Sequence, residues 1–408
     1  MDLSLDQKSQ MLLNMLRGLG KSMFRPLGIE YDQKGEPIPP DHPFFQKLMD
    51  MGLVKPLAAG KDDKEPGKDK KEREGPKTQG RMAVLFAEEA SYWDRGVAVA
   101  FPGPGLGGPP ILKMGTPEQR ERFLKPFTEK KPHWGSFGMT EPGAGSDVAA
   151  IATTARKDGD YYILNGAKTF ISNVKRAEWC VIFATTDKSR GRAGHRAFIV
   201  EKGTPGFEVT RVEKKMGLKA YESCSLTLSD CRVSKDNLLG GESYYDKKEG
   251  FKGAMAAFNS SRALVAVMAI GVGRAAWDYT RAFIKDNYDL SRPVPRYRRV
   301  QERLADVKRK LDTGRLLSWR GAWLLDHDLP NALEASMAKA YCPPVALEAC
   351  RFAVEILGDA GVRSDHYVEK LYRDVKAMDI VEGTQQVQRT VIARRLVGLP
   401  SYTEAGAE

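Results

Sequence analysis

The spacing of apolar residues changes twice along this chain of 408 residues, and no other feature of the sequence constrains the fold more strongly. Up to about residue 132, apolar residues recur at helical spacing, for example between Leu3 and Leu16. Around residue 135 the pattern changes to short β-like runs, and from Gly250 onward long helical patterns return. The sequence therefore predicts helices, then strands, then helices again.

This order indicates an α+β protein, in which helices and strands are segregated along the chain. A chain of this length can bury a large core and divide into subdomains. We expect an N-terminal helical domain at residues 1–132, a middle β domain at 133–242 and a C-terminal helical domain at 243–408.

Local patterns place individual elements inside these domains. One β-like run, Tyr161–Leu164, precedes the turn-forming pair Asn165-Gly166. Further strands are expected at Cys180–Ala184, Ala197–Val200, Phe207–Val212 and Cys224–Leu228. Helices are expected at Phe44–Leu53, Arg81–Tyr92, Phe251–Asp286, Arg299–Asp326, Asn331–Leu357 and Val368–Leu396. The polar segment 60–79 contains helix-breaking residues and is expected to be a mobile surface loop.

Composition excludes several classes of protein. No apolar run approaches the ~20 residues that a membrane span needs, and the acidic N-terminus does not resemble a secretion or organelle signal. The five cysteines are scattered and form no Cys-x-x-Cys pair, which predicts free buried thiols in a reducing cytoplasm. The five histidines show no metal-ligand spacing, so we expect no metal site.

Two glycine-rich strings match nucleotide-binding patterns by letter but not by context. Gly103–Gly108 fits G-x-G-x-x-G, yet two prolines follow it and no alternating strand and helix pattern surrounds it. We therefore expect a tight loop between helices. Gly271–Ala276 falls inside an expected helix, where small residues most often allow helices to pack closely.

Two segments about 240 residues apart carry the chemistry of the chain. Met139-Thr-Glu-Pro-Gly-Ala-Gly-Ser-Asp147 gathers small, turn-forming and hydroxyl residues, which suits backbone contacts to an oxygen-rich ligand. Asp379-Ile-Val-Glu-Gly-Thr-Gln-Gln386 presents one carboxylate, Glu382, beside a glycine and among apolar neighbours. A carboxylate in an apolar, water-poor site has a raised pKa and is a better base.

With Leu164-Asn-Gly-Ala-Lys-Thr-Phe-Ile-Ser-Asn173, these segments resemble the acyl-CoA dehydrogenase family over most of the chain. The resemblance implies an N-terminal helical domain, a middle β-barrel or sandwich and a C-terminal four-helix bundle, with FAD as cofactor. Phe170 stands where many relatives have tryptophan, and Ser172 where many have threonine. By resemblance, FAD is held by Phe137, Met139, Thr140, Gly145, Ser146, Phe170, Ile171, Ser172, Gly383, Thr384 and Gln386.

The resemblance also assigns the catalytic base. Glu382 is expected to remove the α-proton of an acyl-CoA thioester while a hydride leaves the β-carbon for the flavin, giving a trans-2-enoyl-CoA. Its backbone N–H and a flavin ribityl hydroxyl are expected to hold the thioester oxygen. For Arg262 a structural salt bridge is a second, compatible role. The acyl-CoA site is expected to include Ser146, Asn259, Ser260, Ser261 and Arg262.

The implied pathway passes electrons from reduced FAD to an electron-transfer flavoprotein, as in cytoplasmic fatty acid β-oxidation. Two alternatives are kept: a flavin-dependent acyl-CoA oxidase, and a catalytically silent or half-site partner subunit. Retention of Glu382 and of the whole flavin segment argues against the silent role. Val381 replaces a tyrosine of many relatives, which indicates room for a bulky, branched or long acyl group.

Two segments depart from the family pattern in ways that bear on assembly. In homotetrameric relatives a neighbouring subunit holds the FAD pyrophosphate through Arg-x-x-Phe-Gly and Gln-x-x-Gly-Gly. Residues 285–299 lack the first motif, and Glu355 and Asp359 replace a glutamine and a glycine of the second. Negative charge there repels a diphosphate. The departures predict one of two assemblies. The first is an α2β2 heterotetramer with a paralogous subunit, as certain actinobacterial members form. The second is a homotetramer in which substitute arginines replace the missing arginine of the first motif.

The substitute arginines would come from the most basic segment of the chain. Residues 292–310 carry eight arginines and lysines against two acidic residues, so about half of the net charge of +11 lies there. The segment is either a solvated basic helix face or a site for the phosphates of FAD or CoA, with Arg292, Arg296, Arg298 and Arg299 as candidates. We expect no nucleic-acid binding, because no recognised nucleic-acid module accompanies the segment.

Overall fold

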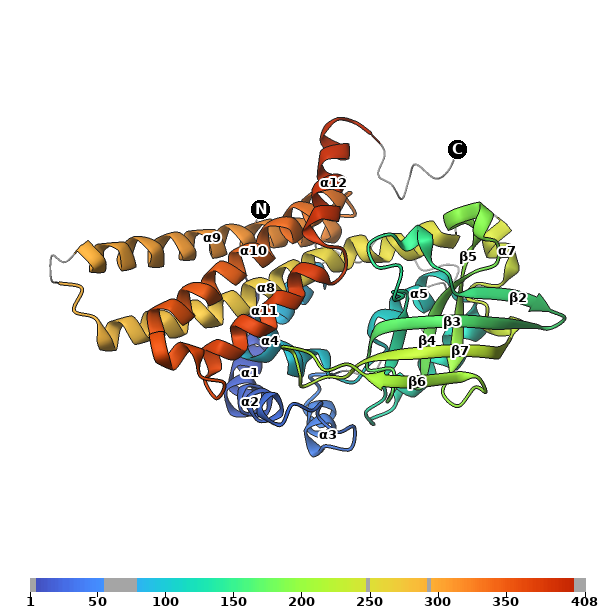
Figure 1. Cartoon of the computed structure of the whole chain (residues 1–408), viewed down its shortest axis with the longest axis horizontal. Helices are drawn as coiled ribbons and strands as arrows, with labels where there is room; N and C mark the ends of the chain where they lie inside the picture. Colours follow the sequence, from blue (N-terminus) through green and yellow to red (C-terminus); the bar gives the residue numbers. More distant parts are fainter. Residues whose placement is uncertain (1–4, 55–78, 247–249, 292–294, 400–408) are drawn as a thin grey trace.

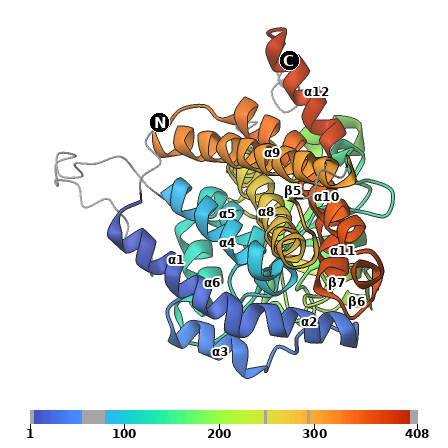
Figure 2. The same cartoon turned by 90° about the vertical axis from the view of Figure 1, so that its left-hand side faces the viewer.

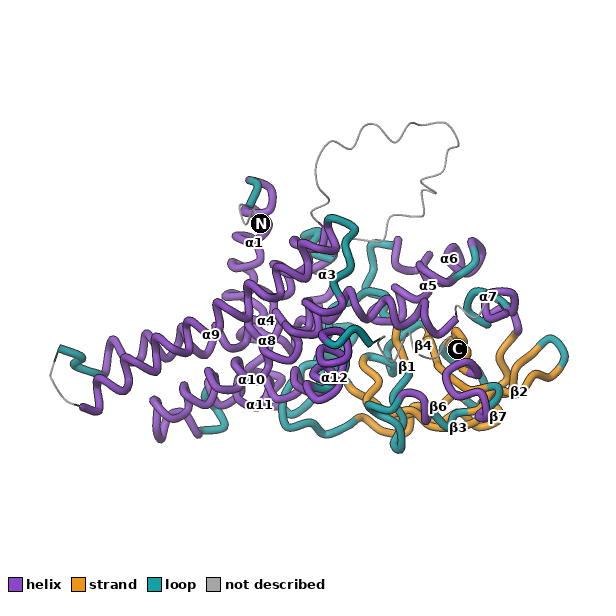
Figure 3. Tube along the Cα trace, turned by 90° about the horizontal axis from the view of Figure 1, so that it is seen from above, coloured by secondary structure: helices purple, strands orange, loops and turns teal. Residues whose placement is uncertain are grey.

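A computed structural model describes residues 5–54, 79–246, 250–291 and 295–399, with side chains throughout except at Lys8, Gln79, Asp246 and residues 250–260. Of the predicted loop at 60–79, residues 60–78 lie outside the described residues. The long helices lie mainly on one side of the molecule and the strands on the other, with short helices beside the strands (Figure 1, Figure 3).

The N-terminal part is helical, as expected. Its helices are α1 (Gln7–Leu19), α2 (Arg25–Lys34), α3 (Pro43–Asp50), α4 (Gln79–Val99), α5 (Gly108–Met114) and α6 (Pro117–Leu124). Local chemistry explains where they begin. The Asp6 side chain accepts a hydrogen bond from the backbone N–H of Ser9 and caps α1, and Thr116 and Gln119 form a reciprocal capping box at α6.

The middle part forms one curled seven-stranded sheet in the order β1-β4-β2-β3-β7-β6, with β5 paired to β4. The strands are β1 (Gly135–Gly138), β2 (Thr154–Asp158), β3 (Tyr161–Ser172), β4 (Trp179–Thr185), β5 (His195–Glu201), β6 (Phe207–Val212) and β7 (Ser223–Ser234). All seven residues of β4 are buried, so this strand forms the centre of the β core.

The prediction that a strand stops before Asn165-Gly166 is wrong. β3 continues to Ser172, and its ladder with β7 shifts register between Leu164 and Gly166. Gly166 has φ +154°, and a Cβ there would lie 2.5 Å from Oγ1 of Thr153. The glycine therefore allows a bulge where the pattern indicated a turn.

The C-terminal part contains α7 (Glu242–Asp246), α8 (Gly250–Asn287), α9 (Pro295–Asp326), α10 (Ala332–Leu357), α11 (Tyr367–Ile380) and α12 (Gln385–Leu396). Helices α8 to α11 lie side by side as the expected bundle (Figure 1, Figure 2). The glycines of α8 serve close packing, as predicted, because a Cβ on Gly271 would lie 2.2 Å from the carbonyl oxygen of Glu88 in α4.

The expected single helix Val368–Leu396 is two helices. The chain leaves α11 after Ile380 and enters α12 at Gln385, and both Glu382 (φ +55°) and Gly383 (φ +93°) are left-handed. Left-handed residues end a right-handed helix, because their backbone cannot continue its hydrogen-bond pattern. The predicted base therefore lies in a break between helices.

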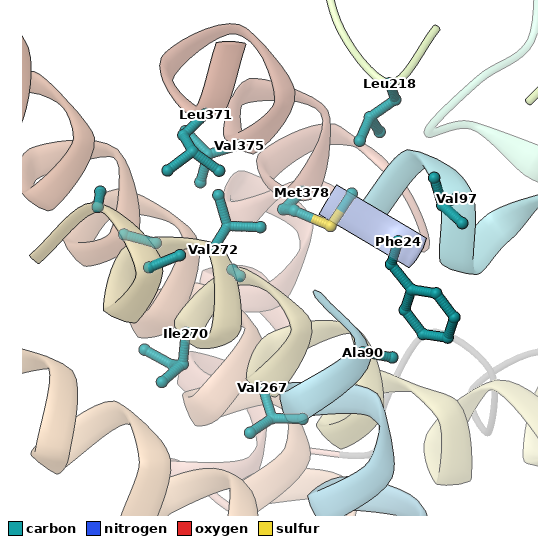
Figure 4. Packing of buried hydrophobic residues seen from close by; sticks show 14 of the residues in the cluster. Phe24, Ala90, Val97, Leu218, Val267, Ile270, Val272, Leu371, Val375 and Met378 are labelled. Atoms are coloured by element: carbon teal, nitrogen blue, oxygen red, sulfur yellow. The ribbon is translucent and has the colours of Figure 1, made fainter. Parts of the chain in front are cut away.

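Two apolar cores hold the molecule together. One joins the N-terminal helices to the bundle (Figure 4), with Phe24 before α2, Val267 and Ile270 on α8 and Met378 on α11. The other surrounds β4. The five cysteines are buried and free, as predicted, and burial raises the pKa of each thiol. In the described part of the chain, no helix has the length and apolar character of a membrane span.

A buried ionic network connects three elements around a break in α4. Asp94 is extended (φ −165°, ψ 117°) and interrupts the helix. Its Oδ1 accepts from the backbone N–H of Val97 at 2.9 Å, and its Oδ2 accepts from Nζ of Lys370 at 2.6 Å. Lys370 also donates to Asp374 at 2.5 Å, whose other oxygen accepts from the N–H of Leu218. Burial alone would lower the pKa of Lys370, but the two carboxylates outweigh burial and raise it.

We predict that Lys370→Met destabilises the protein by about 3–5 kcal/mol, because two buried carboxylates then lose their counter-ion. Urea unfolding at neutral pH measures the change. Arg298→Met is the matched control, since Arg298 forms an exposed pair with Glu302 on α9, and its midpoint should stay at the wild-type value. An unchanged midpoint for Lys370→Met would show that the network does not hold the fold.

Candidate active site

The break between α11 and α12 holds Glu382 in a conformation that few side chains adopt. Its φ of +55° is left-handed, and such positions in non-glycine residues concentrate at functional sites. Gly383 follows with φ +93°, and a Cβ there would lie 2.5 Å from Nε2 of Gln388. The glycine after the base is therefore required by backbone conformation and by space.

Three side chains fix this break. Nζ of Lys339 on α10 donates to the carbonyl oxygen of Gly383 at 3.1 Å, and Nε2 of Gln388 on α12 donates to the same oxygen at 3.4 Å. The Thr384 hydroxyl caps α12 by accepting from the N–H of Val387. The backbone around Glu382 is thus held by side chains of α10 and of α12 with its cap.

The Glu382 carboxylate has the properties of a base in a poorly solvated site. Burial raises its pKa. A hydrogen bond from Oγ of Ser261, at 2.6 Å, acts in the opposite direction by stabilising the charged form. The positive charges of Arg95, Lys339 and Arg262 also oppose the shift, and burial outweighs them.

Predicted site residues on α8 lie beside this carboxylate. Ser261 contacts it directly, and Arg262 interacts with it electrostatically while burial lowers the Arg262 pKa. Asn259 and Ser260 belong to the same helix, but their side chains lie outside those that the structure describes. Val381 is exposed, and its effect on the acyl pocket stays a prediction.

Sequence reasoning missed two cations at the site. Burial lowers the pKa of Lys339 to about 8, although Asp379 and Glu382 act in the opposite direction. Burial also lowers the pKa of Arg95 on α4. The sequence contains a signal for each cation. Lys339 is an isolated charge in the apolar stretch Ala335–Ala340, and Arg95 with Asp94 interrupts the apolar stretch Ala90–Ala100.

The first predicted flavin segment leaves β1 and turns sharply. The carbonyl oxygen of Met139 accepts from Nζ of Lys168 on β3, and that of Thr140 accepts from the N–H of Thr169. Lys168 is fully buried and also pairs with Glu141 at 2.7 Å. Phe137 packs against Phe183 with ring centroids 5.4 Å apart. The segment is therefore fixed to the edge of β3.

Beyond this point the segment forms an exposed turn. Glu141 and Ala144 exchange backbone hydrogen bonds around it, and Gly145 and Ser146 follow as exposed residues. Apart from its chain neighbours, no atom of the described residues lies within 4 Å of a Cβ built on Gly145. On the other side, Gln386 is exposed in the first turn of α12. The predicted FAD contacts Gly145, Ser146 and Gln386 thus lie where a ligand can reach them.

The second flavin segment displays an aromatic ring. Phe170 has φ +57° and a side chain that is 64% exposed, at a register shift between Lys168 and Ile171 of the β3–β7 ladder. Ile171 points into the β core. The Ser172 carbonyl oxygen accepts from Oγ of Ser136 on β1 at 2.8 Å. An exposed phenyl ring on a left-handed bulge suits stacking on a planar ligand.

The two halves of the site meet through Tyr221. The Tyr221 hydroxyl interacts with the Ser172 side chain and with the charge of Arg95, and Arg95 in turn interacts with Glu382. The structure therefore brings the base loop and the flavin strand to one place, although they are about 210 residues apart in sequence. Within the described ranges, no three His, Cys, Asp or Glu side chains are grouped as a metal site requires.

Comparison with family models agrees with this architecture. Residues 6–131 match the N-terminal domain of acyl-CoA dehydrogenases, residues 136–231 the middle domain, and residues 248–397 the C-terminal domain. The boundaries at 132 and 242 that we expected from the sequence stay a prediction.

Of three similar proteins, two carry the name of an acyl-CoA or butyryl-CoA dehydrogenase. The mitochondrial short-chain specific acyl-CoA dehydrogenase of Rattus norvegicus is 38% identical over 71% of this chain and 68% of its own length. A 3-(aryl)acrylate reductase of Clostridium sporogenes is 37% identical over 80% of this chain and 85% of its own. The solved structure of butyryl-CoA dehydrogenase from Megasphaera elsdenii superposes with a TM-score of 0.84 at 32% identity, covering 97% of this chain and 100% of that one.

The three-domain fold, the order of its domains and these relatives lead to one conclusion: the chain belongs to the acyl-CoA dehydrogenase family of oxidoreductases, whose members are flavoproteins that use FAD.

Proposed function

We propose that this chain oxidises an acyl-CoA thioester to the trans-2-enoyl-CoA with FAD as cofactor and Glu382 as the base. The observation that supports this most strongly is the position of Glu382. It lies in a left-handed break, accepts a hydrogen bond from Ser261 and has a pKa raised by burial. Through Arg95 and Tyr221 it faces the strand that carries the predicted flavin contacts.

The residues of the chain explain how an α-proton can be removed. A hydrogen next to a thioester is a weak acid, so the base must be a strong acceptor of protons. Burial makes the Glu382 carboxylate such an acceptor. Its backbone N–H, held in a fixed direction by the contacts of Lys339 and Gln388 to Gly383, would stabilise negative charge that develops on the thioester oxygen.

The described residues fit FAD. Phe170 presents an exposed ring to a planar group, and the turn before Asp147 exposes Gly145 and Ser146 to phosphate. The proposed contacts are Phe137, Met139, Thr140, Gly145, Ser146, Phe170, Ile171, Ser172, Gly383, Thr384 and Gln386. When bound, FAD supplies the acceptor for the hydride that leaves the β-carbon.

For the substrate, Ser146, Asn259, Ser260, Ser261 and Arg262 are the proposed contacts of the acyl-CoA. An electron-transfer flavoprotein is the proposed acceptor of electrons, which places the chain in fatty acid β-oxidation. Five free buried thiols fit a reducing compartment, which supports the cytoplasm. An acyl-CoA oxidase differs in passing electrons to oxygen, so oxygen uptake during turnover separates it from a dehydrogenase.

Substitution of the base tests the proposed function. Glu382→Gln keeps the size of the side chain and removes its proton affinity, so kcat should fall about 10²- to 10⁴-fold while FAD stays bound. Turnover of acyl-CoA with an artificial electron acceptor measures the effect. Glu302→Gln, on the exposed face of α9, is the control and should retain wild-type activity. Full activity of Glu382→Gln would move the base elsewhere and favour the silent-subunit role.

The hydrogen bond from Ser261 should be visible in the pH dependence of catalysis. It stabilises the Glu382 carboxylate, so Ser261→Ala removes an interaction that lowers the pKa and the pKa rises further. The base is then protonated at higher pH, and the acid limb of the kcat profile moves to higher pH. Ser261→Thr retains a hydroxyl and should move the limb less. A profile of Ser261→Ala that coincides with wild type would contradict the proposed role of this contact.

The second part of the proposal concerns how subunits assemble. The residues that bear on it lie where α9 begins and α10 ends. Arg296, Arg299 and Arg303 line a cavity of about 360 Å³ between the start of α9 and the end of α10. Glu355, which we expected to repel a diphosphate, pairs with Arg303 at 2.5 Å and with Arg351 at 3.5 Å. Its charge is therefore offset, and the cavity stays cationic. This supports the homotetramer with substitute arginines over the α2β2 assembly.

FAD content and native mass distinguish the two assemblies. We expect the chain purified alone to be a tetramer with roughly one FAD per chain. The double variant Arg296→Gln/Arg299→Gln should lose FAD, because a cationic cavity that contacts a diphosphate is removed. Arg298→Gln, which changes a neighbouring arginine paired with Glu302, should retain FAD. A chain that holds FAD only when a paralogous subunit is co-expressed would establish the α2β2 assembly instead.

A further inference from the structure

Two buried lysines of the helical bundle have charges that are balanced in different ways. Lys370 on α11 donates to the carboxylates of Asp94 and Asp374, which outweigh burial and raise its pKa. The Lys339 side chain on α10 is completely buried, but its Nζ donates to a neutral group, the carbonyl oxygen of Gly383, at 3.1 Å. Burial lowers the pKa of Lys339 to about 8. The first lysine belongs to an ion-pair network, and the second contacts the backbone beside the proposed base.

Titratable groups from each neighbouring element act on the Lys339 ammonium through space. They are Asp379 on α11, Glu382 in the break, Cys342 on α10 itself and Arg262 on α8. Burial raises the pKa of the Cys342 thiol to about 12, so this group is uncharged at neutral pH. Asp379 already accepts from Lys376 at 3.3 Å and from Gln385 at 3.1 Å. Within this set, Glu382 is the group whose protonation changes in the proposed reaction.

Packing alone does not explain a lysine at position 339. An ammonium that is taken out of water and bonds to a carbonyl recovers less than one that pairs with a carboxylate. A methionine of similar volume would fill the same space without the cost of desolvation. Buried ionisable groups with a shifted pKa concentrate at functional sites. The contact of Lys339 with Gly383 places it at such a site.

The charge of Lys339 meets a conflict that burial creates at Glu382. Burial makes the carboxylate a strong proton acceptor, but it also favours the protonated form, which cannot act as a base. Groups that stabilise the charged form oppose this effect. They are the Ser261 hydroxyl and the charges of Arg95, Lys339 and Arg262. Lys339 acts in this way while it also holds the backbone at Gly383.

We infer that Lys339 is a positioning residue for the proposed base: its hydrogen bond to Gly383 fixes the break between α11 and α12, and its charge keeps Glu382 ionised before the substrate binds. This inference rests on the proposed function and deepens it, because it explains how a buried carboxylate stays ready to take an α-proton at neutral pH. With a neutral side chain at position 339, Glu382 is protonated up to a higher pH.

Substitutions at position 339 separate the charge from the hydrogen bond. FAD-loaded wild type, Lys339→Gln, Lys339→Met and Lys339→Arg are assayed with an acyl-CoA and an artificial electron acceptor from about pH 5 to 9. Lys339→Gln keeps an N–H donor and loses the charge, so the acid limb of kcat should move up by about one pH unit. Its kcat then falls roughly tenfold below the limb and stays near wild type above it.

The other variants complete the comparison. Lys339→Met loses the donor as well, so kcat should also fall above the limb. Lys339→Arg keeps the charge, so its limb should stay near that of wild type. Lys34→Met removes an exposed lysine that pairs with Glu30 on α2, and it should leave the profile unchanged.

Two measurements do not depend on turnover. The infrared difference between a protein and its Glu382→Gln form isolates the band of the protonated carboxyl, and the growth of this band as the pH falls gives the pKa of Glu382. This pKa should be higher in Lys339→Gln than in wild type. In urea unfolding, the midpoint of Lys339→Met should fall much less than that of Lys370→Met, because no buried carboxylate loses a direct partner.

The outcomes distinguish the inference from the proposed function. If wild type and Lys339→Gln have the same acid limb and the same Glu382 pKa, the inference is wrong and the proposed function stands. The same holds if Lys339→Arg moves the limb as far as Lys339→Gln, because the charge is then not the cause. If the FAD-loaded wild type oxidises no acyl-CoA, the proposed function fails, and the infrared titration still decides whether Lys339 sets the pKa of Glu382.

Discussion

The buried contact of Lys370 with Asp94 and Asp374 is the interaction on which the site depends. It holds the break of α4 against α11, and Asp374 also fixes the N–H of Leu218. The three hydrogen bonds, from Lys370 to Asp94, from Lys370 to Asp374 and from the N–H of Leu218 to Asp374, determine where Arg95, Tyr221 and the end of α11 lie. Because burial of such charges is favourable only when every partner is in place, the network specifies one arrangement of three distant segments.

Two left-handed residues complete the site, one on each side. Glu382 lies in the break that follows α11, and Phe170 interrupts the β3 ladder and exposes its ring. Neither conformation is favourable for an L-residue with a large side chain. Hydrogen bonds to Gly383 hold the first, and pairing of β3 with β7 on both sides of the shift holds the second. Rigid neighbours thus maintain local strain where the proposed chemistry takes place.

Much of the fold could be predicted because periodicity is local. The β6 limits at Phe207–Val212 and the end of α10 at Leu357 agree with the pattern, since amphipathic spacing follows from which face is buried. The errors have a common cause. The pattern around Gly166 indicates a turn, but the glycine lies in a bulge, and the pattern after Ile380 indicates a helix where the structure has a break. In both places contacts from other elements, at Thr153 and at Lys339, decide the backbone.

The sequence by itself determined the order of the domains, the family and the short segments that carry Glu382 and the proposed flavin contacts, because residue type and spacing are sufficient for these. Only the tertiary structure decided what surrounds the base. Arg95 and Lys339 are about 290 and 40 residues before Glu382, and neither belongs to a motif. Charge acts through space and is strengthened by burial, so the electrostatics of the site depend on which distant side chains folding brings together.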